Sequence, residues 1–340
     1  MTRRLTKSAK DSNPTELNNI FLPVSRQLQS VEELLKTWSG ESSPVLKKMA
    51  KEVISNQGKL IRPGVLLLIA RHLGYRGNND ITVAAAIEAI HVASLIHDDI
   101  IDGSDIRRGN KTASKSFGAD FSLLLGDFFF IRSIHNIMSL KDRNLSEMIT
   151  QVAQQMVEGE IEELAQSYNF SLSQAQYMKI IEKKTASLFL TSCRLACRLG
   201  KASRKEQAAL EKYGLNLGLV FQIIDDLIDL VGSPLETGKS GFSDLKEGRI
   251  TLPVILALKQ TGPEAASQLE SLLRKTKKGS EKENFSILLN ILKKTGALDL
   301  TVLQAENLAA KAREAVMVLK PSPYRESLLD LVDFVIFRKG

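Results

Sequence analysis

The stretch HVASLIHDDIID, residues His91–Asp102, begins as an apolar helical pattern and ends in a cluster of carboxylates. In an α-helix, residues four or seven positions apart lie on nearly the same face. His91, Asp98 and Asp102 would therefore form one stripe along such a helix. This arrangement needs a chemical reason, because close carboxylates repel one another.

The stretch FQIIDDLID, residues Phe221–Asp229, has the same internal spacing of aspartates. On a helix it places Gln222, Asp225 and Asp229 on one face. Solvated helix ends could explain one such motif alone. Two motifs that each follow an apolar run, with cationic groups in the same chain, favour a shared site instead.

Hard divalent cations explain the clustered carboxylates. Mg²⁺ prefers oxygen ligands and is typically held by one or two carboxylates together with substrate phosphates. Two facing helices could hold several such ions, with phosphate oxygens and water completing each coordination sphere. We therefore predict Mg²⁺ as the cofactor, with Asp98, Asp102, Asp225 and Asp229 as its protein ligands.

Basic residues near these motifs suggest two anion sites, one bridged by metal and one bound directly. They lie in GKLIRP (Lys59 and Arg62), RRG (Arg107 and Arg108), KKTA (Lys184 and Thr185) and a glycine-rich segment (Lys239, Lys246 and Arg249). Each would be unremarkable on its own. Their number and variety favour a substrate that carries phosphate.

The composition is that of a globular protein, with 340 residues, 43% hydrophobic and 25% charged. The net charge of +7 is spread along the chain, which argues against nucleic acid and fits an anionic substrate or weak attraction to acidic membrane surfaces. Cys193 and Cys197 are expected to be buried core residues. No apolar run approaches the length of a membrane-spanning helix, so we expect a cytoplasmic protein. The basic start suggests a flexible tail over 1–20, with a mitochondrial presequence as the alternative.

Proline placement predicts long helices, because no proline lies between Pro63 and Pro234. Helical patterns cover 120–139, 144–168, 173–199 and 204–231, and Asp80 is a candidate N-cap for the helix that carries the first motif. Residues 232–250 are a predicted loop, and 275–284 a linker between shorter helices. The expected fold is one all-α domain over 1–340.

Several motifs, in order, resemble those of the trans-polyprenyl diphosphate synthases. They are GKLIRP, HDDIIDGSDIRRG, GEIEEL, EKKTASLF, YGLNLGLVFQIIDDLIDL and GKSGFSDLKEGRITLP, within residues 45–255. The resemblance implies an isoprenoid synthase-type bundle of antiparallel helices around a deep central cavity, three Mg²⁺ ions and a homodimer. It also implies head-to-tail transfer of a prenyl group to isopentenyl diphosphate, with release of pyrophosphate.

The family's roles carry over to matching positions. Residues that match those binding isopentenyl diphosphate are Lys59, Arg62, His91 and Arg108. Residues that match those holding the allylic diphosphate are Arg107, Lys184, Thr185, Gln222 and Lys239. Those expected to carry catalysis are Asp98, Asp102, Lys184 and Asp225.

Three positions depart from the family pattern: Lys111 before Thr112, Ser114, and Glu163 in place of a common glutamine. A subunit of a heteromeric synthase therefore stays open as an alternative. A class I terpene cyclase is disfavoured, since its second metal motif mixes Asn, Ser or Thr and Glu at wider spacing.

Product length depends on the helix that leads to Asp98. One helical turn rises about 5.4 Å, on the order of one isoprene unit. Ala93 and Ser94 lie near one turn before Asp98, where short-chain members of the family have aromatic rings that form a floor. Two small residues there predict a long product. The alternatives are a floor on another helix and a short-chain, geranylgeranyl product.

Overall fold

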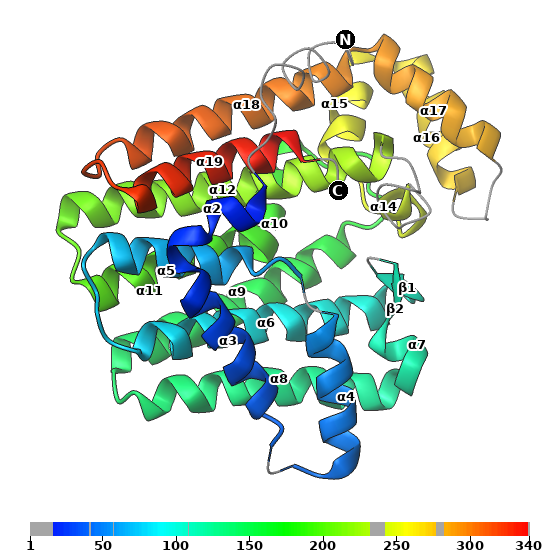
Figure 1. Cartoon of the computed structure of the whole chain (residues 1–340). Helices are drawn as coiled ribbons and strands as arrows, with labels where there is room; N and C mark the ends of the chain where they lie inside the picture. Colours follow the sequence, from blue (N-terminus) through cyan, green and yellow to red (C-terminus); the bar gives the residue numbers. More distant parts are fainter. Residues whose placement is uncertain are drawn as a thin grey trace.

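The computed structural model describes residues 16–40, 42–56, 58–107, 109–231, 242–276 and 282–338. Within them the chain is built almost wholly from helices, which confirms the all-α prediction (Figure 1). A single short hairpin interrupts the described helices. It pairs β1 (Ile106–Arg107) with β2 (Asn110–Lys111) in antiparallel register.

The proline-free stretch forms the long helices of the bundle. They are α6 (Asn79–Ile101), α8 (Ala119–Ser139), α9 (Arg143–Ala165), α10 (Gln174–Ile181), the π-helical turn η2 (Glu182–Ala186), α11 (Ser187–Gly200) and α12 (Arg204–Val231). These bounds agree with the predicted ranges to within a few residues. Because α10, η2 and α11 follow one another directly, the predicted helix over 173–199 is continuous but contains a π-helical turn.

Shorter elements precede and follow these helices. Before them are α2 (Leu17–Ile20), η1 (Leu22–Val24), α3 (Ser25–Thr37), α4 (Pro44–Ser55) and α5 (Ile61–His72), and α7 (Ala113–Phe117) follows the hairpin. After them are α14 (Ser243–Lys246), α15 (Leu252–Gln260), α16 (Pro263–Thr276), α17 (Lys282–Lys294), α18 (Ala297–Val316) and α19 (Pro323–Phe337).

The helix α6 forms the centre of the bundle. It packs along α8 on one side and against α5 on another, while α12 lies against α11 and α18 (Figure 1). Ser133 on α8 donates a hydrogen bond to the carbonyl of Ala86 at 2.9 Å, and His97 lies 3.2 Å from the carbonyl of Leu123. Since the residue numbers run in opposite directions, α6 and α8 are antiparallel.

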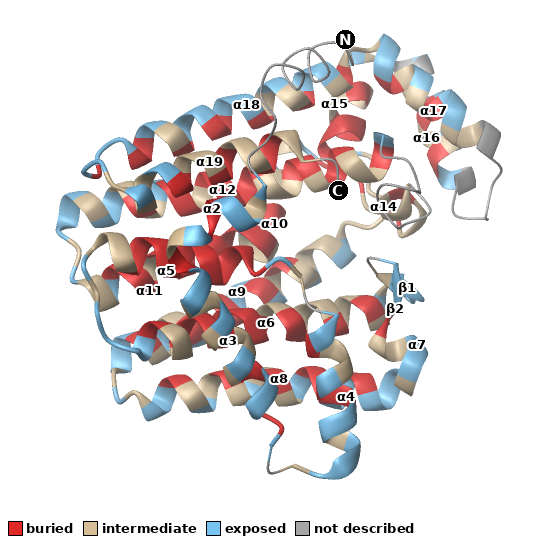
Figure 2. Ribbon diagram, viewed as in Figure 1, coloured by how far each residue is buried: buried red, intermediate tan, exposed pale blue. Residues whose placement is uncertain are grey.

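Burial explains why α6 is so apolar. By length and composition it is the one helix of the described chain that could cross a membrane, so the expectation that no apolar run approaches this length was wrong. However, 67% of its apolar window is buried inside the protein (Figure 2). It is therefore the core helix of a bundle. Such a helix can be as long and as apolar as one that spans a membrane.

Asp80 does not cap α6, and that prediction was wrong. The helix begins at Asn79, and the carboxylate of Asp80 is fully buried against Arg71 at 2.7 Å. A buried carboxylate is stable only with a partner, and an arginine one element earlier provides it. Asp80 therefore ties α6 to α5.

The predicted tail over 1–20 is also wrong at its C-terminal end. Leu17–Ile20 is helical, and Ile20 is buried in the core. Residues 1–15 lie outside the described chain, as do 232–241 of the predicted loop and 277–281 of the predicted linker. Cys193 and Cys197 are both buried, as expected.

Candidate active site

The first aspartate motif lies at the C-terminal end of α6. Asp102 is the C-cap residue that follows Ile101, and its backbone N–H donates to the carbonyl of Asp98 at 2.8 Å. Burial raises the pKa of Asp98, and the positive charges of Lys184 and Arg107 oppose that shift. The carboxylate of Asp102 is paired with the guanidinium of Arg249.

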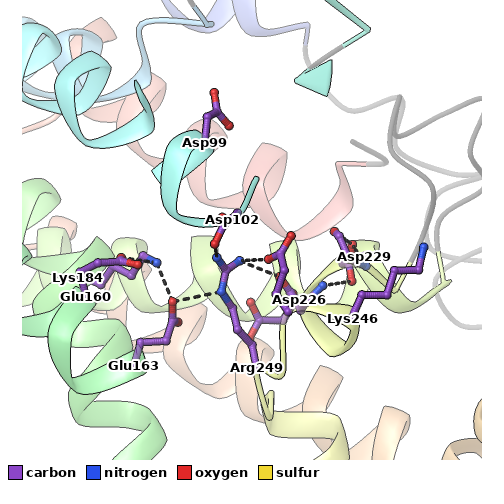
Figure 3. A network of polar contacts seen from close by, with 12 residues as sticks. Asp99, Asp102, Glu160, Glu163, Lys184, Asp226, Asp229, Lys246 and Arg249 are labelled. Carbon is purple, nitrogen blue, oxygen red and sulfur yellow. Dashed lines mark hydrogen bonds and ion pairs between the residues drawn. The ribbon is translucent and has the colours of Figure 1, made fainter. Parts of the chain in front are cut away.

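The middle aspartate of this motif has a different environment. Asp99 is buried and accepts a hydrogen bond from Arg107 Nε at 2.7 Å. It points away from Asp102 (Figure 3). Asp99 therefore fixes Arg107, a predicted ligand of the allylic diphosphate, and this role was absent from the sequence prediction.

The second motif lies at the end of α12. Gln222 donates to the buried carboxylate of Asp226 at 2.8 Å and accepts from the Thr185 hydroxyl at 2.7 Å. The Tyr177 hydroxyl also donates to Asp226, at 2.6 Å. Burial raises the pKa of Asp226 well above its usual value. These bonds connect the end of α12 to the turn η2.

The two outer aspartates of the second motif differ in their partners. Asp225 is partly exposed and lies 2.7 Å from Arg338 Nη2 at the end of α19. Asp229 accepts hydrogen bonds from the backbone N–H groups of Ser243 and Asp244, at 3.1 and 3.2 Å. In this structure Asp229, a predicted metal ligand, caps the first turn of α14.

The turn η2 carries Lys184 into the site. Its ammonium lies 2.5 Å from Glu160 and 2.6 Å from Glu163 of α9. Burial alone would lower the pKa of Lys184, but the negative charges of Glu163 and Asp98 outweigh it and the pKa is raised. Lys184 therefore stays charged beside the first aspartate motif.

Two glycines allow η2 to sit between α9 and α12. A Cβ on Gly159 would lie 2.6 Å from the backbone nitrogen of Lys184, and one on Gly218 would lie 2.5 Å from Ala186 Cα. A side chain at either position would displace the turn. π-Helical turns inside helices often occur at functional sites, and this one presents Lys184 and Thr185.

Two of the residues predicted for isopentenyl diphosphate, Lys59 and Arg62, lie against aromatic rings. Arg62 is buried beneath the rings of Phe189 and Phe221, with centroid distances of 4.6 and 5.6 Å. Lys59 is exposed and lies 5.6 Å from the ring of Phe334 on α19. His91 is half-buried on α6. Arg108 and Lys239 lie outside the described residues.

Arg338 was missed by sequence reasoning. Its guanidinium lies 3.7 Å from the Phe221 ring and donates to the Phe221 carbonyl at 2.7 Å, besides contacting Asp225. Arg338 lies in the C-terminal segment YRESLLDLVDFVIFRKG, and no spacing rule links that segment to α12. Contacts between segments so far apart in sequence need a structure.

The chain-length residues lie on the same helix as Asp98. Ala93 is buried, and half-buried Ser94 donates from its hydroxyl to the His91 carbonyl at 2.9 Å. A cavity of about 70 Å³ lies between α4, α6 and α7 and is lined partly by Val92, Ile96 and Asp99, but by neither chain-length residue. The product tunnel along Ala93 and Ser94 stays a prediction.

The donor chemistry of the site suits a hard divalent cation. Asp98, Asp102 and Asp225 offer carboxylate oxygens, and Lys184 and Arg107 bring positive charge for phosphate. Among the described residues, no three histidine, cysteine, aspartate or glutamate side chains are already grouped as an ion would need. Arginines instead contact Asp102 and Asp225.

Comparisons with known proteins agree with this geometry. The family model for polyprenyl synthetase matches residues 43–291. Octaprenyl diphosphate synthase of Escherichia coli (strain K12) is 35% identical over 294 residues, covering 86% of this chain and 90% of that protein. The chloroplastic solanesyl diphosphate synthase 2 of Arabidopsis thaliana is 32% identical and covers 99% of this chain and 81% of its own length.

Solved structures give the same result. A polyprenyl synthase from Caulobacter crescentus CB15, complexed with calcium and isoprenyl diphosphate, has a TM-score of 0.90 at 31% identity, covering 96% of this chain and 99% of that one. A decaprenyl diphosphate synthase from Rhodobacter capsulatus has a TM-score of 0.87 at 30% identity, covering 94% and 98%. The fold is therefore the all-α isoprenoid synthase fold, and the chain belongs to the polyprenyl synthetase family.

Proposed function

We propose that this protein condenses isopentenyl diphosphate head-to-tail onto an allylic diphosphate, such as farnesyl diphosphate, and makes a long-chain all-trans polyprenyl diphosphate. The observation that carries this proposal is the meeting of α6, η2 and α12. Lys184 of η2 lies beside the first aspartate motif, and its neighbour Thr185 bonds Gln222 of the second. An allylic diphosphate between the two motifs would meet carboxylate-bound metal and Lys184 together.

Asp98, Asp102 and Asp225 would hold Mg²⁺, which supplies Lewis-acid charge that makes the diphosphate a better leaving group. Lys184 and Arg107 add fixed positive charge, and Asp99 orients Arg107. Lys59 and Arg62 would hold the second diphosphate so that its double bond attacks the allylic carbon. The departing pyrophosphate is the proposed proton acceptor. Three ions per site remain part of this proposal.

A long product is proposed because α6 has small residues where a floor would form. Ala93 and Ser94 leave the wall before Asp98 without an aromatic ring. Relatives named octaprenyl and solanesyl diphosphate synthases support this choice. Geranylgeranyl diphosphate synthases occur among the similar solved structures, for example at 27% identity, so product length is measured directly in the test below.

We also propose a homodimer, on the basis of an apolar stripe that is exposed in the single chain. Exposed apolar residues spaced along one face of α8 are Phe121, Leu124, Ile131 and Met138. Those on the neighbouring helix α9 are Val157, Ile161 and Leu164. Monomeric proteins rarely expose a contiguous apolar patch of this kind. Cytoplasmic location, with weak membrane contact during product release, completes the proposal.

The test is incubation of the purified chain alone with farnesyl diphosphate, labelled isopentenyl diphosphate and Mg²⁺. Mass analysis should give a product well beyond the geranylgeranyl length, in the range of the octaprenyl, solanesyl and decaprenyl diphosphate synthases that this chain is similar to. A geranylgeranyl product would overturn the long-chain assignment. No product without a second protein would favour a subunit of a heteromeric synthase.

A further inference from the structure

Arg249 contacts carboxylates from three separate parts of the fold. Its partners are Asp102 at the end of α6, Glu163 on α9 at 3.2 Å, Asp244 on α14 at 3.3 Å and Glu247 just after α14 at 2.8 Å. Its side chain is only 19% exposed. Figure 3 shows the guanidinium between Asp102 and Glu163. Arg249 therefore joins the first aspartate motif to the segment that follows the second.

The position of Arg249 does not depend on Asp102. Its backbone N–H donates to the carbonyl of Asp244 at 2.8 Å. Tyr168, which follows α9, holds the same turn with two hydrogen bonds. Its backbone N–H donates to the Gly248 carbonyl at 2.8 Å, and its hydroxyl donates to the Lys246 carbonyl at 2.9 Å. With Glu163, Asp244 and Glu247 still in contact, the guanidinium would stay in place if Asp102 left it.

Asp102 needs a positive partner when no metal ion is bound to it. It is 9% exposed and lies one turn from Asp98, so an unpaired charge there would be strongly disfavoured. Lys184 supplies positive charge beside Asp98, but its ammonium forms ion pairs with Glu160 and Glu163. Arg249 supplies it to Asp102.

We propose that Arg249 is an exchangeable counter-ion for Asp102. In the metal-free chain it neutralises Asp102, and a divalent cation takes Asp102 from it while Arg249 stays on its other carboxylates. Ion binding is then a competition, so Arg249 lowers the affinity of the first motif for metal and stabilises the chain before metal arrives. This inference rests on the metal-binding role of Asp102 in the proposed function.

The experiment compares Mn²⁺ binding, followed by electron paramagnetic resonance without substrate, in the full-length wild-type protein and its variants. Arg249→Gln should bind Mn²⁺ roughly fivefold more tightly, since the competing ion pair is gone. Arg249→Lys should give a smaller gain, because one ammonium cannot span the same carboxylates, and it carries the test if Arg249→Gln does not fold. Arg194→Gln, which removes the remote Arg194–Glu211 pair of 3.2 Å, should leave Mn²⁺ affinity unchanged.

A double variant separates this exchange from a new site formed by the other carboxylates. Adding Arg249→Gln to Asp102→Asn should give no gain in Mn²⁺ affinity over Asp102→Asn alone, because the proposed exchange acts through Asp102. Thermal unfolding gives a second readout: the rise in Tm from EDTA to Mn²⁺ should be larger in Arg249→Gln than in the wild type.

Unchanged or weaker Mn²⁺ binding in both Arg249 variants would overturn the inference. So would a double variant that binds Mn²⁺ more tightly than Asp102→Asn alone. None of these measurements requires turnover. A wild-type protein that makes no polyprenyl product would contradict the proposed function but leave the Mn²⁺ comparison valid, so the two failures are distinguishable.

Discussion

The backbone nitrogen of Lys184 lies directly against Gly159, where an added Cβ would be only 2.6 Å away. Alanine is favoured over glycine in a helix by up to about 1 kcal/mol, so propensity alone predicts that Gly159→Ala stabilises α9. The contact predicts the opposite, with a net loss on the order of 1–3 kcal/mol from overpacking. Displacement of Lys184 should also lower kcat about tenfold. Urea unfolding and steady-state kinetics measure both effects.

Gly262→Ala is the control, because a Cβ there would have no neighbour within 4 Å. It should change neither stability nor kcat measurably. A Gly159→Ala variant that is more stable than the wild type and fully active would show that the close contact with Lys184 has no consequence.

Asp98→Asn should abolish most turnover without unfolding the protein. Burial raises the pKa of Asp98, so its charged form is disfavoured in the folded chain and the neutral amide should be tolerated. Loss of a metal ligand should lower kcat by about 10²–10³-fold or more. Asp105→Asn is the matched control, since its exposed pair with Lys115 at 2.9 Å is worth little. Substantial activity in Asp98→Asn would rule out its metal role.

Ser94→Phe should shorten the product by at least one isoprene unit, as seen by mass analysis. Ser94 is half-buried, whereas Ala93 is 2% exposed, so Ala93→Phe carries a packing penalty of about 1–3 kcal/mol that confuses the result. Ser94→Ala, which keeps the wall small, is the control and should leave product length unchanged. An unaltered product in Ser94→Phe would place the floor on another helix.

The sequence predicted the long helices and both aspartate motifs because these depend on local periodicity. Spacing places Asp98 and Asp102 on one stripe without any knowledge of the fold. It could not predict that Asp229 caps α14, that Asp80 pairs with Arg71, or that Arg338 reaches Asp225. Each of these contacts joins segments that are distant in sequence or lie on different elements. The partner of a charged side chain is therefore decided by which segments pack together.

Ile131→Asp should convert the proposed homodimer to a monomer. Ile131 is 64% exposed at the middle of the apolar stripe on α8, and a charge there would be buried without a partner in a dimer. Light scattering coupled to size-exclusion chromatography measures the mass. Leu303→Asp, at 51% exposure on α18, is the control and should leave the mass unchanged. A wild-type mass of one chain would contradict the homodimer itself.

Acidification should weaken the junction between α5 and α19 through His72. Its Nδ1 lies 2.8 Å from the hydroxyl of Ser322, which caps α19 by accepting from the N–H of Arg325. Burial lowers the pKa of His72 below its ordinary 6.5, Glu206 opposes the shift and Arg325 adds to it. The unfolded chain therefore binds the proton more readily than the folded chain, and this stabilising contribution is present above pH 6.5 and is lost as pH falls through the lowered pKa.

His72→Gln should accordingly be less sensitive to acid than the wild type. Between about pH 7.5 and about pH 5.5 its Tm should fall by about 1–2 °C less, measured by circular dichroism. Lys212→Gln, which removes an exposed ion pair with Glu314 of 3.0 Å, should keep the wild-type dependence. If His72→Gln lost as much Tm as the wild type, the acid sensitivity would come from other groups. A smaller loss would identify His72 as the group through which acid weakens the packing of α19 on α5. Arg338, which contacts Asp225, lies at the end of that same helix.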